Sequence, residues 1–349
     1  MAALIPELMS AVVLTGHGGF NHLHYVTDAP VPRPSADEVL IEVGASAVNN
    51  TDINTRLGWY SRNPDADDKT AWSGSALAFP RIQGADCCGR IVAVGSDVDA
   101  TRVGERVLVR TMQDPDVTGT QITLGSEIDG AFAQYVAVRS SEAFAIDSTW
   151  TDGELASLPC SYSTAEGLLQ RAGISADERV LITGASGGVG SAAVQLAKRR
   201  GAHVTAVAHP DKKSTLLDIG ADVVLARGVE PLSALAANSI DAVIDVVGGP
   251  GFPDLLTVLR PRGRYAVSGA VAGPHVDLDL RDLYLKDLTL LGCTFHERAV
   301  FENLVGYVER NEVRPLVAAT YPLAEIVAAQ ERFLAKDFVG KIVLVPPQP

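Results

Sequence analysis

Cysteine is scarce in this sequence, with four residues in 349. Four scattered cysteines do not make a disulfide framework, and they favour a reducing, cytoplasmic compartment. Basic residues are also in short supply: 29 lysines and arginines face 42 aspartates and glutamates, for a formal net charge of −13. This imbalance argues against nucleic acid or an anionic membrane surface as the main partner. No apolar run is long enough to span a bilayer, and we expect no secretory signal, because residues 1–10 lack a basic cluster.

The pattern of the chain changes near Thr151, and its length is typical of two domains. Residues 1–150 read as short strands broken by Gly, Pro and Asp, which is typical of a barrel or a sandwich. From residue 151, apolar strands alternate with helical segments, and such alternation builds a doubly wound parallel sheet. A last strand is expected at Lys341–Val345, where it could return to the first domain. The polar segment Ser61–Pro80 is expected to be a long loop.

One glycine-rich turn indicates a dinucleotide site. The run Thr183-Gly184-Ala185-Ser186-Gly187-Gly188-Val189-Gly190 follows the apolar strand Arg179–Ile182 and precedes a helical segment and a second strand, Val204–Ala208. Glycines allow the backbone to turn tightly and approach a pyrophosphate, which the free N–H groups at the helix start can bind. The alternative is a tight strand-to-helix connection without a ligand, but the strand, helix and second strand that a dinucleotide site needs are all present.

The end of the second strand favours NADPH over NADH. A chain that binds NAD usually has an acid there, ~20 residues past the glycines. Here the strand ends in Ala208-His209-Pro210, and Asp211 is followed at once by Lys212 and Lys213. A histidine and two lysines suit a 2′-phosphate. The alternative is that Lys212 and Lys213 form the solvated start of a helix, although cations there oppose the helix dipole.

Several motifs together resemble a known family. They are Val48-Asn49-Asn50-Thr51-Asp52, Gly84-Ala85-Asp86-Cys87-Cys88-Gly89, the segment Leu158–Ala165, the glycine turn, and Gly340-Lys341-Ile342-Val343-Leu344. With these, the chain resembles the medium-chain dehydrogenase/reductases, and more closely their zinc-free quinone oxidoreductases, the zeta-crystallin-like group. The resemblance implies an α/β fold in which a Rossmann doubly wound parallel sheet accompanies a GroES-like β-barrel domain. We therefore expect a GroES-like domain at residues 1–150, completed by about 310–349, and a Rossmann cofactor domain at 151–309.

The same resemblance bears on zinc. Zinc-dependent relatives hold a catalytic metal with cysteine, histidine and a further cysteine or aspartate, and a glutamate follows the histidine. The matching positions here are Asn49, Ala85, Asp86 and Cys160. Asparagine and alanine cannot replace a thiolate and an imidazole in a tight tetrahedral site, so we expect no metal site. Cys87 and Cys88 cannot both face one metal, because adjacent strand residues point to opposite faces. We expect both to be buried apolar residues.

Without zinc, the chain lacks a Lewis acid to polarise an alcohol or ketone. This favours hydride transfer from NADPH to a conjugated acceptor, either a quinone or an α,β-unsaturated carbonyl, whose oxyanion product is stabilised. The resemblance also implies nicotinamide-side contacts, which taken alone would be loop glycines, capping hydroxyls or a surface lysine. They are Asn49, Thr164, Val247-Gly248-Gly249, Ser268-Gly269, Cys293-Thr294 and Lys341.

Tyr60 is the best candidate for a proton donor, because a tyrosine in the corresponding segment of enoyl-thioester reductase relatives donates a proton or orients the substrate. The alternative is an aromatic wall, since Tyr and Trp line many pockets. Nearby Arg56 could pair with Asp52 or reach an anionic substrate. Asn49 is expected to orient the nicotinamide or the developing oxyanion.

Four functions stay open: quinone or enone reductase, enoyl-thioester reductase, a relative of zinc-type alcohol dehydrogenases, and a cofactor-binding protein with little turnover. A small molecule is the expected substrate. A homodimer is expected through the apolar strand Leu288–Leu291, because an exposed edge strand needs cover.

Overall fold

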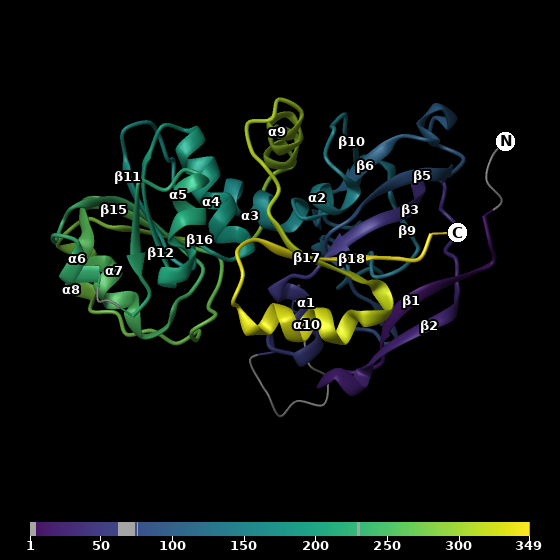
Figure 1. Ribbon diagram of the computed structural model, residues 1–349, viewed down its shortest axis with the longest axis horizontal. Helices are drawn as coiled ribbons and strands as arrows, with labels where there is room; N and C mark the ends of the chain where they lie inside the picture. Colours follow the sequence, from purple (N-terminus) through teal and green to yellow (C-terminus); the bar gives the residue numbers. More distant parts are fainter. Residues whose placement is uncertain (1–4, 62–73, 75, 229–230, 349) are drawn as a thin grey trace. The chain divides into compact units, whose positions relative to one another are not determined.

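The chain divides into two compact units, which the computed structural model describes over residues 5–61, 74, 76–228 and 231–348 (Figure 1). Unit 1 comprises Met1–Cys160, Phe301–Asp337 and Lys341–Pro349, and unit 2 comprises Ser161–Val300 and Phe338–Gly340. The limits expected from the sequence were residues 150 and 309, whereas the contacts divide the chain at residues 160 and 300. Among the described residues, no helix combines the length and apolar character needed to cross a bilayer.

Unit 1 is built mainly from antiparallel strands. Its strands are β1 (Leu8–Leu14), β2 (Leu23–Pro30), β3 (Glu38–Ala47), β4 (Arg81–Ile82), β5 (Cys88–Val94), β6 (Arg106–Val109), β7 (Met112–Gln113), β8 (Ile122–Thr123), β9 (Tyr135–Arg139), β10 (Ala143–Ala145), β17 (Val317–Pro322) and β18 (Lys341–Val345). The largest sheet has the order β10-β6-β5-β3-β18-β17, with β9 also paired to β3. Separate small sheets have the orders β2-β1-β4 and β7-β8.

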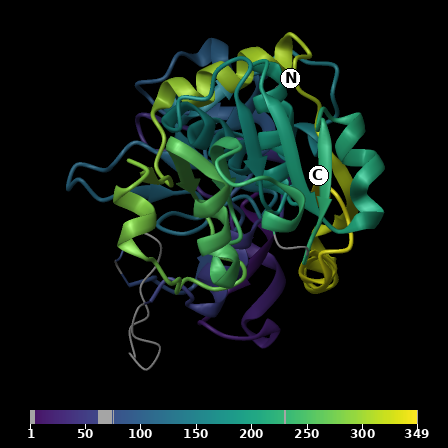
Figure 2. The same ribbon diagram turned by 90° about the vertical axis from the view of Figure 1, so that its left-hand side faces the viewer.

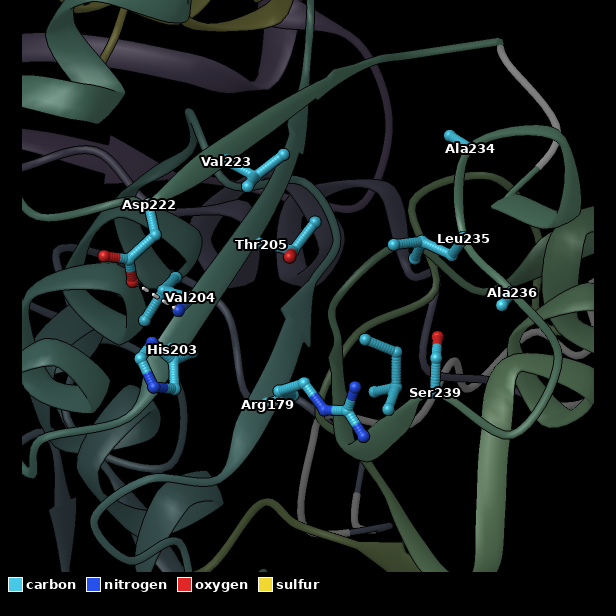
Figure 3. Close-up of a pocket in the computed structure, with 11 residues that line it drawn as sticks. Arg179, His203, Val204, Thr205, Asp222, Val223, Ala234, Leu235, Ala236 and Ser239 are labelled. Carbon is cyan, nitrogen blue, oxygen red and sulfur yellow. Dashed lines mark hydrogen bonds between the residues drawn. The ribbon is translucent and has the colours of Figure 1, made fainter.

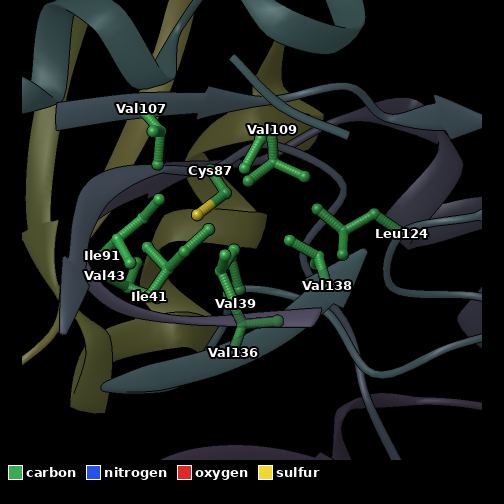
Figure 4. Close-up of a cluster of buried hydrophobic side chains, with 12 residues drawn as sticks. Val39, Ile41, Val43, Cys87, Ile91, Val107, Val109, Leu124, Val136 and Val138 are labelled. Carbon is green, nitrogen blue, oxygen red and sulfur yellow. The ribbon is translucent and has the colours of Figure 1, made fainter. Parts of the chain in front are cut away.

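One of the apolar clusters of unit 1 packs against one face of β3. Side chains alternate along a strand, so Val39, Ile41 and Val43 all point to one face, where they pack with Cys87 and other apolar residues (Figure 4). This packing places Cys87 in the interior. Burial raises the pKa of both the Cys87 and Cys88 thiols, which makes them poor nucleophiles.

The C-terminal strand returns to unit 1, as expected from the sequence. Strand β18 pairs with β3 in antiparallel register, with Val343 opposite Ala47, and with β17 in parallel register. The helices of this unit are α1 (Asn50–Leu57), α2 (Asp152–Ala156) and α10 (Ile326–Ala335), together with most of α9 (Arg298–Glu309). Helix α1 begins directly after β3 at a capping box formed by Asn49 and Asp52.

Unit 2 is a parallel sheet with helical crossovers, the arrangement expected from the alternating pattern (Figure 2). The strand order is β13-β12-β11-β14-β15-β16, and all of these pairs are parallel. The strands are β11 (Arg179–Ile182), β12 (His203–Ala208), β13 (Val223–Ala226), β14 (Ile240–Asp245), β15 (Leu259–Val267) and β16 (Thr289–Gly292). The helices are α3 (Pro159–Arg171), α4 (Gly188–Arg199), α5 (Lys213–Asp218), α6 (Pro231–Ala234), α7 (Phe252–Val258) and α8 (Leu280–Tyr284). This order places β11 at the centre, so the glycine turn that follows it lies mid-sheet.

Some expected elements differ in detail. The apolar run over residues 132–138 is one of the short strands that the sequence of this unit predicts, but β9 begins only at Tyr135. The Phe132 N–H instead donates to the Gln83 carbonyl at 2.8 Å, which uses the backbone group that a longer β9 would need. Most of the loop expected over 61–80 lies outside the described residues.

Candidate active site

The glycine turn of unit 2 has the geometry of a phosphate cradle. Gly184 has φ +56°, a left-handed conformation that favours glycine. A Cβ atom at Gly190 would lie 2.2 Å from the Gly184 carbonyl oxygen, so only glycine fits where the helix packs against the turn. Helix α4 begins after Gly187, where no side chain caps the first N–H groups. Those uncapped donors fit an external anion, so the turn suits the pyrophosphate of a dinucleotide.

The end of β12 brings one of the two expected lysines to this turn. Lys212 Nζ lies 3.5 Å from the Ser186 Oγ atom. Lys213 is the first residue of α5 and is exposed, as the solvated alternative anticipated. His209 is half-exposed, and its Nδ1 atom accepts from the Asp211 N–H at 3.4 Å. The structure therefore separates the two lysines and places only Lys212 at the glycine turn.

The ends of β14, β15 and β16 carry the other expected cofactor contacts. Val247 and Gly248 follow β14, and a Cβ atom at Gly184 would lie within 3.0 Å of the Val247 side chain. Ser268 and Gly269 follow β15, and Cys293 and Thr294 follow β16. The Ser268 N–H donates to the Asp245 carbonyl and the Cys293 N–H to the Val267 carbonyl, which ties neighbouring strand ends together. Thr164 lies half-buried on α3.

Unit 1 contains a buried polar cluster around Asn49. The Asn49 Nδ2 atom donates to the Asp86 carboxylate at 2.8 Å and to the Ala47 carbonyl at 3.1 Å. Lys341 Nζ donates to the Asn49 Oδ1 atom and to Asp86 Oδ2, the latter at 2.8 Å. The remaining Asp86 oxygen accepts from the Cys160 N–H at 2.7 Å. Lys341 is therefore a buried, ion-paired residue and not a surface lysine.

Asp52 adds a second carboxyl group to this Asn49 cluster. Its oxygens accept from the Asn49 N–H at 2.7 Å and the Ala85 N–H at 3.3 Å. Burial raises the pKa of Asp52 to about 7, and the nearby Asp86 charge adds to the rise, while those hydrogen bonds and Lys341 oppose it. When Asp52 is protonated, the positive charge of Lys341 balances the negative charge of Asp86, and the cluster has no net charge.

Tyr60 lies near this cluster but does not join it through a hydrogen bond. Its hydroxyl donates to Thr51 Oγ1 at 3.2 Å, and its ring packs edge-on against Trp59. Burial raises the pKa of the Tyr60 phenol, and the negative forms of Cys160 and Asp52 also contribute. The phenol therefore stays protonated near neutral pH, yet it is a weaker acid than a free tyrosine.

Arg56 is a structural residue and does not pair with Asp52. It is 2% exposed, and its guanidinium donates to the Gly18 carbonyl at 2.6 Å and to Gln330 Oε1 at 3.2 Å. It also stacks over the Phe20 ring. Both alternatives considered from the sequence, an Asp52 partner and an anionic substrate, are thus set aside for Arg56.

The four positions that match zinc ligands do not form a metal site by their chemistry. Asp86 already pairs with the Lys341 ammonium, and Asn49 and Ala85 supply neither a thiolate nor an imidazole. Within residues 5–61, 74, 76–228 and 231–348, no group of three or more His, Cys, Asp or Glu is placed to hold a metal ion. The donor set that remains does not fit zinc.

A hollow of about 380 Å³ in unit 2 is lined by none of the cofactor-contact residues described above (Figure 3). It is lined by the first residues of four strands, Arg179, His203, Val223 and Ile240, together with Asp222 and others. Ligands of open parallel sheets bind at the carboxyl ends of the strands, and this hollow is at the amino ends. We therefore do not assign it to the cofactor.

Comparison with known families explains this arrangement. The family described as "Alcohol dehydrogenase GroES-like domain" matches residues 35–148, and the one described as "Zinc-binding dehydrogenase" matches residues 188–310. The chain belongs to the medium-chain dehydrogenase/reductase superfamily. Its members are oxidoreductases that bind NAD(P), and the fold observed in both units is the one that the family implies.

Similar proteins within this superfamily include two kinds of reductase. Acryloyl-coenzyme A reductase from Metallosphaera sedula is 30% identical, over 96% of this chain and 99% of its own length. Quinone oxidoreductase from Rattus norvegicus is 27% identical, over 97% and 98%. A solved structure from Sinorhizobium meliloti 1021, whose assignment as an alcohol dehydrogenase is provisional, is 49% identical with a TM-score of 0.92, and each chain covers 98% of the other.

Reasoning from the sequence missed the importance of Asp86, Asp52 and Asp245. Asp86 was considered only as a metal-ligand position and Asp52 only as a partner of Arg56. Asp245 ends an apolar strand with a charged residue, and a carboxylate at the end of a buried strand was the signal available for it.

Proposed function

We propose that this oxidoreductase is a zinc-independent, NADPH-dependent reductase of conjugated acceptors, either quinones or α,β-unsaturated carbonyls. The observation that supports the proposal is the ion pair between Lys341 and Asp86, because it puts an ammonium group among the positions that match zinc ligands. An ammonium cannot coordinate an alkoxide as a Lewis acid does. Alcohol oxidation therefore loses its usual catalyst, while reduction of an activated double bond does not need one.

In this proposal, NADPH supplies a hydride to the electron-poor carbon, and a proton completes the reduction. Unit 2 holds the dinucleotide through the first N–H groups of α4, and Lys212 pairs with the 2′-phosphate. The strand ends at Val247, Ser268 and Cys293 are proposed to contact the nicotinamide half. Charge-assisted hydrogen bonds from the lysine would discriminate NADPH from NADH.

Asn49 is proposed to orient the site and not to donate to the oxyanion. Both of its amide hydrogens are already donated, to Ala47 and to Asp86, so it has no N–H left for an oxyanion. Its Oδ1 atom accepts from Lys341 and, in the capping box, from the Asp52 N–H, so both of its lone pairs are used. Of the two roles expected from the sequence, orientation of the nicotinamide is therefore favoured, and it is proposed to be indirect, because Asn49 fixes Lys341 and Asp86. The hydrogen-bond donor for the oxyanion is proposed to be Tyr60.

A panel assay tests the proposal. The purified chain is mixed with NADPH and a series of quinones, enones and enoyl thioesters, and in parallel with NADP⁺ and alcohols, while its zinc content is measured. We expect turnover with conjugated acceptors, no stoichiometric zinc, and no effect of a chelator. One zinc per chain together with alcohol oxidation would overturn the proposal, and NADPH binding without turnover on any acceptor would favour a cofactor-binding protein.

Enoyl-thioester reduction is the second candidate, favoured by the 30% identity to an acryloyl-coenzyme A reductase. The discriminating measurement compares acryloyl-coenzyme A with a short acryloyl thioester that lacks the nucleotide. A much larger kcat/KM for the coenzyme A form would show that the chain binds the carrier. Equal values would leave the simple conjugated acceptor as the substrate class.

A further inference from the structure

Asp245, at the end of β14, is fully buried, and its carboxylate is surrounded by neutral donors. Its Oδ1 atom accepts from the Thr183 hydroxyl and from the Val247 N–H at 2.8 Å. Its Oδ2 atom accepts from the Tyr265 hydroxyl and from the Gly248 N–H at 3.1 Å. Within the part of the chain that the structure describes, it forms no ion pair. A buried carboxylate is costly unless its lone pairs are satisfied, so these donors must all be in place.

The partners of Asp245 come from three adjacent strand ends. Thr183 follows β11 and precedes the glycine turn, Val247 and Gly248 follow β14, and Tyr265 belongs to β15. The backbone carbonyl of Asp245 also accepts from the Ser268 N–H at 3.1 Å. Through its side chain and its backbone carbonyl, Asp245 therefore connects the ends of β11, β14 and β15.

The loop that Asp245 holds is conformationally demanding. Gly248 and Gly249 have φ +62° and +72°, and a Cβ atom at Gly249 would lie 2.8 Å from the Ala272 carbonyl oxygen. A loop of two left-handed glycines has many other conformations available, so its native shape needs restraint. The hydrogen bonds from the Val247 and Gly248 N–H groups to one carboxylate supply that restraint.

We propose that Asp245 is a positioning residue for the dinucleotide: it fixes the loop Val247–Gly249 against the glycine turn so that the nicotinamide half meets a preformed site. Tyr265 and Thr183 orient the carboxylate, and the carboxylate orients the loop. Burial and the adjacent Asp245 charge raise the pKa of the Tyr265 phenol, which therefore remains a donor at all working pH values. The inference concerns dinucleotide binding, so it does not depend on which acceptor is reduced.

Two variants and one control test the proposal. Asp245→Asn keeps the shape but replaces one accepting oxygen by an NH₂ group, and Tyr265→Phe removes one donor to the carboxylate. Tyr162→Phe is the matched control, because Tyr162 is also buried in unit 2 and its hydroxyl accepts from Gln195 at 2.8 Å, away from the strand ends. Dissociation constants are measured for NADPH and for adenosine 2′,5′-bisphosphate, a probe that lacks the nicotinamide half.

We expect Asp245→Asn to raise the Kd for NADPH roughly 10-fold, and Tyr265→Phe to raise it by a smaller factor, as for loss of a positioned hydrogen bond. The Kd for the bisphosphate should stay unchanged in both, and Tyr162→Phe should change neither constant. Hydrogen exchange of the Val247 and Gly248 amides should speed up in Asp245→Asn and not in Tyr162→Phe.

Unchanged NADPH affinity in both variants, or equal weakening of NADPH and the bisphosphate, would overturn the proposal. Binding of NADPH by the unmodified chain is measured first, and it reports on the proposed function separately from the comparison of variants. If Asp245→Asn does not fold, Tyr265→Phe decides the question alone.

Discussion

Lys341 and Asp86 form a buried ion pair, with Nζ 2.8 Å from the carboxylate and neither side chain more than 3% exposed. The same ammonium group also fixes the Asn49 amide. The geometry of the candidate site thus depends on one charge that is supplied by the C-terminal strand.

Replacing Lys341 by methionine should therefore be strongly destabilising. The change keeps an unbranched side chain but leaves Asp86 charged and unpaired in the interior, which typically costs about 3–5 kcal/mol. The free energy of unfolding from urea titration measures the loss. Lys198→Met is the matched control, because Lys198 pairs with Asp222 at the surface, where such pairs contribute about 1 kcal/mol or less. Equal losses in the two variants would contradict the buried pair.

Asp52 predicts a pH dependence of stability. Its pKa is about 7 in the folded chain against an ordinary 3.8, so between these values the folded state keeps a proton that the unfolded state has lost. The contribution of Asp52 to the free energy of unfolding therefore falls as pH rises from about 4 to 7, by about 4 kcal/mol at most. Above pH 7 this contribution is constant.

Asp52→Asn should remove this slope. Unfolding free energies at pH 5 and pH 8 are compared for both chains, and the advantage of the natural chain over the variant should shrink toward pH 8. Asp279→Asn is the control, since hydrogen bonds from Arg281 lower the Asp279 pKa to about 2 and it stays ionised throughout. If the unfolding free energies of the natural chain and Asp52→Asn change with pH in parallel, the pKa of Asp52 is not raised in the folded chain.

The two lysines after β12 should differ in their effect on cofactor choice. Lys212→Ala should weaken NADPH binding roughly 10-fold or more and leave NADH nearly unchanged, because Lys212 is at the glycine turn and a charged hydrogen bond to phosphate is lost. Lys213→Ala, at the exposed start of α5, should have a smaller effect. Equal affinity of the unmodified chain for NADPH and NADH in a fluorescence titration would dismiss the phosphate site.

The sequence predicts those parts of the fold that local patterns determine. The strands expected at 179–182 and 341–345 match the structure residue for residue, because short apolar runs bounded by turns have few alternatives. The glycine turn was equally readable, since left-handed φ values and close backbone approach both require glycine.

The buried polar clusters around Asn49 and Asp245 could not be predicted in the same way. Asn49 and Lys341 are 292 residues apart, and no local pattern shows that β18 returns to β3 with the lysine facing inward. Taken alone, Lys341 looked like an ordinary surface residue. Asp245 and Tyr265 come together only because β14 and β15 are neighbours in the sheet. A side-chain contact that depends on how distant strands pair has no local pattern in a single sequence.

The edge strand β16 predicts a homodimer. Three of its four residues are exposed, and exposed apolar side chains gather in the same stretch of the chain. These side chains are Val271, Val276, Leu278, Leu280, Tyr284, Leu285, Leu290 and Phe295. Pairing of two such edges across a twofold axis would cover both strands and their apolar neighbours.

Light scattering at micromolar concentration should give twice the chain mass, and Leu290→Lys should shift the protein toward monomer by placing charge at the edge. Val223→Lys is the control, because β13 is the opposite edge of the same sheet and Val223 is 47% exposed. A monomeric natural chain would refute the dimer. If Val223→Lys dissociates the dimer and Leu290→Lys does not, the interface is at β13.

Tyr60→Phe tests how the reduction is completed. The change keeps the ring against Trp59 and removes only the hydroxyl that now donates to Thr51. If Tyr60 protonates the enone product, enone turnover should fall by ~10²-fold or more, whereas quinone reduction should fall less, because its anionic product takes a proton from water. Burial raises the pKa of this phenol, so Tyr60 should cause no loss of activity at any pH where a free tyrosine stays protonated. The ratio of the two losses in one variant is the measurement. Equal and small losses would dismiss the proton donor and leave Tyr60 as an aromatic wall beside the Asn49 cluster.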